Sequence, residues 1–226
     1  MRILFGVLRV AIAAAIIAAV IGQLIVSTNN WHSAGLADVS IQVINFFSFF
    51  TIESNVLTVV VMLIGAWFLF TRAGDDVGWL LGLRLATVTY MATTGIVYNL
   101  LLRGVELPQG TTLPWSNEVL HLVGPVYVIL DWLLAPGRRP VAWKSLWPIL
   151  IFPLAWGIYT LIRGPLTYDA ILKRDYWYPY PFLNPNTAPE GYASVAFYIV
   201  LIAVVIGVVC AGAIWLSKKR LPDFSR

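Results

Sequence analysis

Hydrophobic residues form six long runs along the chain, separated by short polar connections. A helix that crosses a membrane needs about 20 predominantly apolar residues, and each run approaches or exceeds that length. The runs cover residues 3–26, 42–70, 79–102, 117–135, 145–162 and 192–216. This pattern predicts an all-α integral membrane protein, in which six transmembrane helices form one bundle and residues 1–226 form a single membrane domain.

Two of the runs need separate comment. The second is longer than a bilayer requires, so we expect it to tilt or to begin as an interfacial segment. The first resembles a secretory signal peptide, whose apolar region is normally about 7–15 residues long. This run instead continues to Val26 with Arg9 inside it, so we expect it to remain in the mature protein.

Composition supports the membrane interpretation and limits the chemistry. The chain is 59% hydrophobic and 12% charged, whereas soluble domains carry about 25% charged residues. Its net charge of +4 is typical of a membrane protein with basic cytoplasmic loops, so we expect no nucleic-acid partner. One cysteine, Cys210, and two histidines, His32 and His121, exclude a disulfide framework, a thiolate zinc site and a three-histidine metal site. We expect neither a metal nor a cofactor.

The distribution of basic residues predicts the orientation. If both termini are cytoplasmic, the inner side carries most of the lysines and arginines, namely Arg2, Arg9, Arg72, Arg84, Arg138, Arg139, Lys144, Lys218, Lys219, Arg220 and Arg226. The outer side then carries Arg103, Arg163, Lys173 and Arg174. Cytoplasmic segments are enriched in lysine and arginine, so this asymmetry predicts that both termini are cytoplasmic.

The longest connection, residues 163–191, is rich in aromatic residues and prolines between Asp175 and Phe182. Prolines prevent a continuous helix, and amphipathic aromatic rings favour the membrane interface. We expect an outer flap that lies on the lipid headgroups. Whether it is an aromatic belt or controls access of a substrate stays open.

Polar residues within the second run recur at helical spacing. They are Asn45, Ser48, Thr51, Asn55 and Thr58. Steps of three and four residues place them on one helical face, which must point into the bundle. Glu53, two residues from Thr51, points roughly 200° around the helix and so belongs to a different environment.

The third and fourth runs carry similar polar faces. In the third run these residues are Thr87, Tyr90, Thr94, Tyr98 and the adjacent Asn99. In the fourth they are Asn117, His121 and Asp131, on one face with Gly124 and Val128, and Glu118 lies beside that face. Their depths predict two clusters. An outer cluster combines Thr51, Ser48, Asn55, Glu118 and His121, lined by Tyr98 and Asn99. An inner ion-pair network combines Arg9, Arg84 and Asp131 and holds three spans together.

The outer cluster contains the elements of a nucleophilic site. A threonine hydroxyl needs an adjacent base, and a neutral histidine is the usual one, so Thr51 and His121 form a candidate pair. Asn55 could donate to a developing oxyanion, and Glu118 could orient the imidazole or stabilise its charge. Each residue also has a structural interpretation, because threonine, asparagine and histidine commonly bond the backbone or pack between membrane helices.

Three segments together resemble a known family. They are the run from Asn45 to Asn55, then His121 followed by Pro125 and by Asp131-Trp132, and then the stretch from Tyr176 to Pro181. The combination resembles bacterial members of the androgen-induced-gene protein family, which includes the androgen-dependent regulator of tissue factor pathway inhibitor. The resemblance covers most of the chain and all six spans.

The resemblance implies a six-span intramembrane threonine hydrolase of fatty acid esters of hydroxy fatty acids. It implies Thr51 as the nucleophile and His121 as the general base, and a location in the bacterial plasma membrane. The expected partners are a lipid or fatty acyl ester substrate and the membrane lipids. For the acyl chain we expect an apolar channel lined by Phe46, Phe47, Phe50 and Val128.

Other classes of protein remain open. A proton- or ion-coupled carrier could use Glu53, Glu118, His121 and Asp131, although the chain shows no internal repeat of the kind common in carriers. A haem-binding electron carrier would need His32 and His121 as paired ligands. In a purely structural membrane protein the polar faces would be packing contacts. The sequence does not indicate an oligomeric state.

Overall fold

The structure, a computed structural model, describes residues 1–105 and 112–219. This part of the chain is helical, and its β-type pairing is a single isolated bridge between Asp169 and Arg174. The α-helices are α1 (Arg2–Ser33), α2 (Ser40–Phe47), α3 (Phe50–Thr71), α4 (Gly78–Val97), α5 (Pro114–Glu118), α6 (Gly124–Leu134), α7 (Leu146–Arg163) and α8 (Tyr192–Ser217). Two π-helical turns, η1 (Tyr98–Leu102) and η2 (Val119–Val123), extend α4 and join α5 to α6. Short 3₁₀ turns are η3 (Trp143–Ser145), η4 (Gly164–Leu166) and η5 (Pro181–Leu183).

Six helical segments are long and apolar enough to cross a membrane. They are Arg2–Ser33, Phe50–Thr71, Gly78–Leu102, Pro114–Leu134, Trp143–Leu166 and Tyr192–Ser217. The six expected spans are therefore present in the expected order, as in a multi-pass membrane protein. The first is longer than predicted, because α1 continues past Val26 as far as Ser33, where Ser27 and Trp31 are buried against the rest of the molecule.

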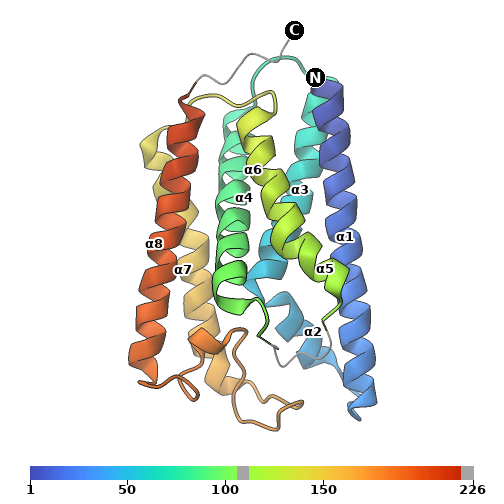
Figure 1. Ribbon diagram of the computed structural model, residues 1–226, viewed down its shortest axis with the longest axis vertical. Helices are drawn as coiled ribbons and strands as arrows, with labels where there is room; N and C mark the ends of the chain where they lie inside the picture. Colours follow the sequence, from blue (N-terminus) through green and yellow to red (C-terminus); the bar gives the residue numbers. More distant parts are fainter. Residues whose placement is uncertain (106–111, 220–226) are drawn as a thin grey trace.

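The helices form an upright bundle in which α4 lies centrally (Figure 1). Of the six segments, the one that includes α4 is the most buried, at 56% of its apolar window, against 11% for the segment that includes α7. Helix α1 packs along α3, while α7 and α8 pack together and α8 contacts α4. The start of α1 and the end of α8 lie at the same end of the bundle. Arg220 and Arg226, two of the residues expected on the inner side, lie outside the described residues.

The predicted second span is two helices instead of one. Helix α2 ends at Phe47, the backbone extends at Phe49 with ψ near 129°, and α3 begins at Phe50. Side chains from elsewhere bond the interrupted backbone, because Trp156 Nε1 donates to the Ser48 carbonyl at 3.0 Å. The single polar face expected over 45–58 is therefore wrong: Asn45 lies on α2, Ser48 in the break, and Thr51, Asn55 and Thr58 on α3.

A buried charge network connects the helices at the end where the chain starts. Arg9 of α1 donates to both carboxylate oxygens of Asp131 on α6, at 2.8 and 3.0 Å. Arg84 of α4 donates to Asp131 Oδ2 at 2.9 Å and also pairs with Asp76. The structure thus brings together Arg9, Arg84 and Asp131 and adds Asp76, which the sequence analysis missed. Two acids balance two arginines, which offsets the cost of burying four charges.

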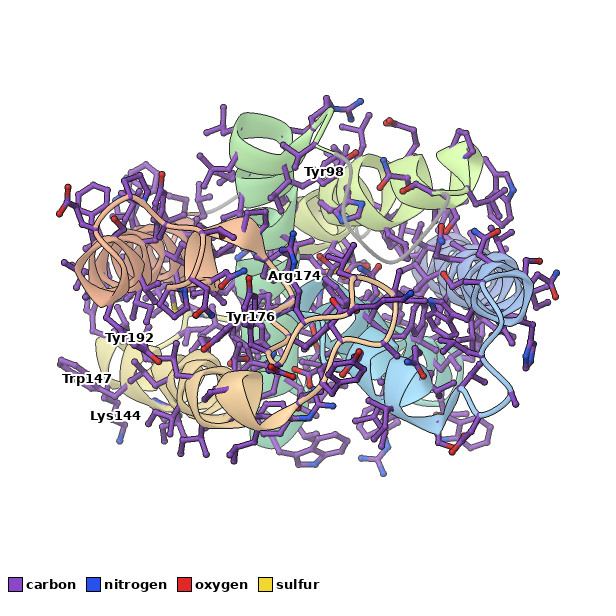
Figure 2. All side chains as sticks on the ribbon, turned by 90° about the horizontal axis from the view of Figure 1, so that it is seen from below. Tyr98, Lys144, Trp147, Arg174, Tyr176 and Tyr192 are labelled. Carbon is purple, nitrogen blue, oxygen red and sulfur yellow. The ribbon has the colours of Figure 1, made fainter. Side chains whose placement is uncertain are left out.

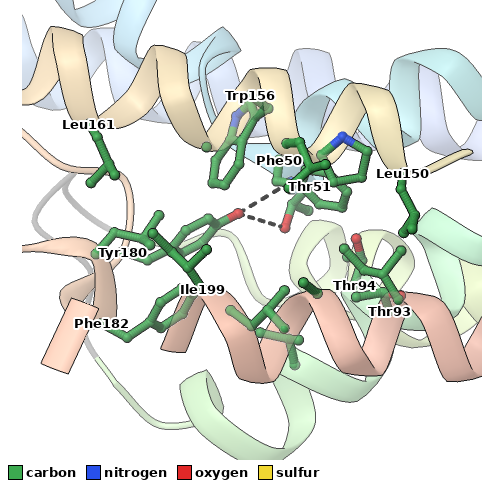
Figure 3. A pocket seen from close by; sticks show the side chains of 18 of the residues that line it. Phe50, Thr51, Thr93, Thr94, Leu150, Trp156, Leu161, Tyr180, Phe182 and Ile199 are labelled. Carbon is green, nitrogen blue, oxygen red and sulfur yellow. Dashed lines mark hydrogen bonds between the residues drawn. The ribbon is translucent and has the colours of Figure 1, made fainter. Parts of the chain in front are cut away.

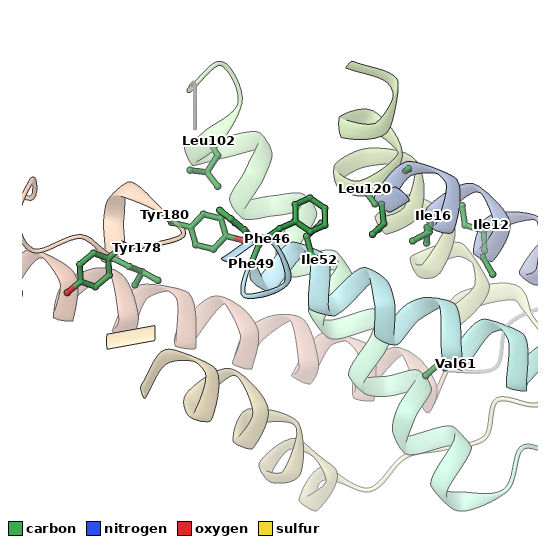
Figure 4. Packing of buried hydrophobic residues seen from close by; sticks show 14 of the residues in the cluster. Ile12, Ile16, Phe46, Phe49, Ile52, Val61, Leu102, Leu120, Tyr178 and Tyr180 are labelled. Atoms are coloured by element: carbon green, nitrogen blue, oxygen red, sulfur yellow. The ribbon is translucent and has the colours of Figure 1, made fainter. Parts of the chain in front are cut away.

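The aromatic stretch of the connection between α7 and α8 packs into the bundle, whereas the sequence predicted a flap on its outer surface. Its rings pack into the lower end of the bundle, where Trp177, Tyr178 and Tyr180 are 6–7% exposed. The ring of Phe49 makes edge contacts with Trp177 and Tyr180 (Figure 4). Seen from below, Arg174 and Tyr176 lie on the segment that crosses this end (Figure 2). Burying these rings stabilises the insertion, because aromatic side chains bury a large area and dominate the energetics of packed cores.

Candidate functional site

A mostly apolar cavity of about 340 Å³ lies where α3 begins, between α4, α7, α8 and the inserted loop. Apolar side chains form most of its wall, among them Leu161, Phe182 and Ile199 (Figure 3). Its polar groups are few and include Thr51, Thr93 and Thr94. A cavity of this size and lining suits part of an acyl chain, since ligand pockets are mostly apolar with a few placed polar groups.

The hydroxyl of Thr51 differs from the other threonine hydroxyls in this wall. Thr93 Oγ1 donates to the Thr89 carbonyl four residues earlier, and Thr94 Oγ1 bonds the Ser54 hydroxyl. Thr51 Oγ1 instead lies 3.3 Å from the Tyr180 hydroxyl, which also accepts the Thr51 backbone N–H at 3.2 Å. The helix break explains this, because Thr51 lies in the first turn of α3, where backbone N–H groups have no acceptor within the helix.

Tyr180 is therefore part of the environment of Thr51. Its side chain is buried, and burial raises the pKa of its phenol to about 12. The hydroxyl stays protonated at neutral pH, so it can accept the Thr51 N–H and still donate one hydrogen bond. Sequence analysis missed this residue because it placed the aromatic stretch on the membrane surface.

His121 lies in the π-helical turn η2, next to the other π-helical turn, η1. Its imidazole stacks on the Tyr98 ring with centroids 3.8 Å apart. Nδ1 lies 2.9 Å from the Asn117 carbonyl, which can only accept, so Nδ1 carries a proton and Nε2 of the neutral ring is the basic atom. Tyr98 also lines the cavity. Isolated π-helical turns occur frequently at functional sites.

The structure does not bring Thr51 and His121 into hydrogen-bond contact, although both belong to the described residues. Their helices nevertheless meet at this level. Asn55 Nδ2 donates to the Thr51 carbonyl at 2.8 Å and to the Leu120 carbonyl at 3.3 Å, so one amide connects the turn of Thr51 to the residue before His121. The Tyr98 ring stacks on the His121 imidazole and also lines the cavity that contains Thr51. Tyr98 therefore links the two candidate residues.

Two residues expected to support the reaction, Asn55 and Glu118, have other hydrogen-bond partners in the structure. Asn55 does not point its amide toward a reacting carbonyl, because that amide holds backbone carbonyls of α3 and η2. Glu118 does not orient His121; its two oxygens accept from Arg103 at 2.8 and 3.1 Å, and this bidentate bond raises the pKa of Arg103. The Asn117 carbonyl, and not Glu118, accepts the hydrogen bond that orients the His121 imidazole.

Of the remaining supporting residues, Ser48 and Asn99 lie outside the cavity wall. Ser48 donates to the Ile44 carbonyl and bonds the Tyr159 hydroxyl at 3.0 Å. Asn99 is exposed and donates to the carbonyls of Gly95 and His121. Tyr98 lines the cavity as expected.

The expected acyl channel is only partly correct. Of its four proposed residues, Phe50 lines the cavity beside Thr51, whereas Phe47 lines a second cavity on the other side of α3. Phe46 and Val128 are buried in the hydrophobic core. Phe46 and Phe47 belong to α2, Phe50 to α3 and Val128 to α6, so the four side chains face different parts of the molecule.

The acids proposed for a carrier differ in their partners. Glu118 pairs with Arg103, and Asp131 pairs with Arg9 and Arg84. Glu53 faces the second cavity, away from Thr51, as the helical spacing predicted. Carboxylates held by arginines are poorly suited to release and rebind protons, so the carrier hypothesis loses two of its acids.

Comparison with known proteins identifies neither a family nor a function for this chain. No family model, curated protein or solved structure matches this chain.

Proposed function

We propose that this protein is an intramembrane hydrolase of lipid carboxylic esters, with Thr51 as its nucleophile. The observation that carries the proposal is the position of Thr51: its hydroxyl lies in the wall of an apolar cavity in the first turn of α3, beside its own backbone N–H, which has no acceptor within the helix. The sequence resemblance to the androgen-induced-gene protein family supports the same residue.

The start of α3 favours the charge that develops during ester cleavage. The Thr51 N–H has no acceptor within the helix, and the positive end of the helix dipole lies there. In the resting structure the Tyr180 oxygen accepts this N–H. A substrate carbonyl oxygen that takes that place would receive the N–H and the Tyr180 O–H together, which is the arrangement that stabilises a tetrahedral oxyanion.

His121 is the general base in this proposal. Substrate entry displaces the Tyr98 ring, which both lines the cavity and covers the imidazole, and brings His121 Nε2 to the Thr51 hydroxyl. Thr51 Oγ1 then bonds the ester carbon while its proton passes to Nε2, and the alcohol leaves with that proton. Water hydrolyses the acyl-threonine by the same proton path and releases the carboxylic acid.

The lining of the cavity defines the substrate class. Its apolar wall accepts an acyl chain, and a lipid ester can enter directly from the membrane without transfer to water. Fatty acid esters of hydroxy fatty acids belong to this class, and the resemblance suggests them as the first substrates to test.

The decisive experiment compares Thr51→Ala with Thr51→Ser. Purified variants are assayed with a fatty acid ester of a hydroxy fatty acid and with a p-nitrophenyl acyl ester, and are labelled with a fluorophosphonate probe. We expect Thr51→Ala to lose turnover and labelling and Thr51→Ser to retain both, because serine supplies the same hydroxyl. His121→Ala should lower turnover by about 10²–10⁴-fold.

The matched control is Thr71→Ala, at the far end of α3, where the exposed hydroxyl bonds its own helix. It should behave like the wild type. Full turnover by a Thr51→Ala protein with an unchanged elution profile would disprove the proposal.

A further inference from the structure

A second cavity, of about 810 Å³, lies between α3, α4 and α7. It shares no lining residue with the cavity at Thr51. Its wall is apolar and aromatic, with rings from Phe47, Trp79, Tyr90 and Phe152. One acidic side chain, that of Glu53, interrupts this lining.

The carboxylate of Glu53 has no counter-charge among the described residues. Its Oε2 is shielded from solvent and has no hydrogen-bond partner there. By contrast, Asp76, Asp131 and Glu118 each pair with an arginine. An ionised carboxylate within a membrane-spanning helix is costly unless a cation or donor meets it, so Glu53 is a candidate binding group.

The aromatic lining adds a second attraction for a cation. The faces of aromatic rings carry negative potential and bind ammonium groups, and Trp is the strongest of them. The Tyr90 hydroxyl already donates to the Ile149 carbonyl at 2.7 Å, so it does not satisfy Glu53. A carboxylate in a cavity lined by aromatic rings therefore favours a positively charged ligand over a neutral or anionic one.

The shape of the cavity indicates an elongated ligand. Lining residues on α3 extend from Glu53 to Val60, a rise of about 10 Å at 1.5 Å per residue. Gly82 leaves space on the α4 side, because a Cβ placed there would meet no atom within 4 Å. Exposed Val56, Val60 and Trp79 place part of the wall on the outer surface of the bundle, where a membrane amphiphile has access.

We propose that this cavity binds a single-chain cationic amphiphile, with its ammonium group on Glu53 and its alkyl chain along α3 toward Val60. The ammonium supplies the counter-charge that Glu53 lacks. The chain occupies the apolar part of the cavity.

The test uses the full-length protein in nanodiscs of zwitterionic lipid. The probe is a dodecyltrimethylammonium that carries a photoreactive diazirine in its chain, and a diazirine-bearing dodecanol is its neutral counterpart. Cross-linked peptides are identified by mass spectrometry, and unlabelled dodecyltrimethylammonium competes. We expect saturable labelling of the segments around residues 53–60, 79–90 and 145–152 by the cationic probe, about tenfold stronger than by the neutral one.

Two variants remove the site in different ways. Glu53→Gln keeps the shape but removes the charge, and should lower cationic labelling to the level of the neutral probe. Gly82→Leu keeps the charge but fills the cavity, and should lower labelling by both probes. Glu190→Gln, an acid-to-amide change at an exposed position outside the spans, is the matched control and should label like the wild type.

Thr51→Ala should also label like the wild type, which separates this proposal from the hydrolase. Equal labelling of wild type by the two probes, or undiminished cationic labelling of Glu53→Gln, would overturn the proposal.

Discussion

The hydroxyl of Thr51 is set apart by one break in the backbone. Within a continuous helix, serine and threonine donate to the carbonyl four residues earlier, as Thr58 does to Ser54 at 2.7 Å. Thr51 lies in the first turn after the extended residue Phe49, so its hydroxyl and its N–H both turn to Tyr180. The same break therefore places a hydroxyl and a backbone donor side by side at one point of the cavity wall.

At the same scale, Tyr180 gives a pH-dependent prediction. Burial raises the pKa of its phenol to about 12, above the ordinary value near 10. Between these values the unfolded chain loses the proton and the folded chain keeps it, so the free energy of unfolding falls as pH rises, by about 2–3 kcal/mol from this residue. Tyr180→Phe should lack that part of the fall.

Denaturant unfolding of wild type and variant at about pH 9 and pH 12 measures the difference. Tyr168→Phe, which changes an exposed tyrosine of the same connection, is the control and should follow the wild type. Identical alkaline destabilisation of wild type and Tyr180→Phe would contradict the prediction.

At the scale of elements, the close approach of α1 and α3 positions the charge network. Arg9 crosses the α3 surface at Gly65, where a Cβ would lie 2.6 Å from Arg9 Nη1. The same guanidinium donates twice to Asp131 on α6. One glycine therefore lets an arginine of the first span reach an aspartate of the fourth.

We expect Gly65→Ala to displace Arg9 from Asp131. Overpacking of this kind typically costs about 1–3 kcal/mol, and the loss is measured as a lower free energy of unfolding in detergent. Gly212→Ala on α8 is the matched control, because its Cβ would meet no atom within 4 Å. Alanine favours helix over glycine by about 1 kcal/mol, so the control should be unchanged or more stable. Equal effects of the two changes would refute the packing argument.

At the scale of the whole molecule, the two ends of the bundle differ in chemistry. The charge network and most basic residues lie toward the end that carries the start of the chain, whereas buried aromatic rings fill the opposite end. Basic residues favour the cytoplasmic side. We therefore expect the aromatic end to face outward, which is the orientation that the distribution of lysines and arginines predicts.

This orientation predicts a labelling pattern in intact bacterial cells. Glu190→Cys should react with a membrane-impermeant maleimide, and Lys144→Cys should react only after the cells are permeabilised. The wild type is the control, because its single cysteine, Cys210, is fully buried. Labelling of Lys144→Cys but not of Glu190→Cys in intact cells would reverse the orientation.

The sequence alone was sufficient for the features that depend on local pattern. Hydrophobic length predicted six spans in their order, because a bilayer demands about 20 apolar residues from each helix. Helical spacing placed Glu53 and Thr51 on different sides of α3, and they line different cavities. Buried charges must find partners, so Arg9, Arg84 and Asp131 could be grouped before their contacts were known.

Only the tertiary structure decided which groups meet. Thr51 and Tyr180 are 129 residues apart, and no periodicity reports that an aromatic connection inserts into the bundle. The break at Phe49 was equally hidden, because the side chains that bond the interrupted backbone come from α7 and the inserted loop. Glu118 pairs with Arg103 and not with His121 for the same reason. Spacing along a helix limits which face a side chain occupies. Its partner on that face depends on which other part of the chain packs there.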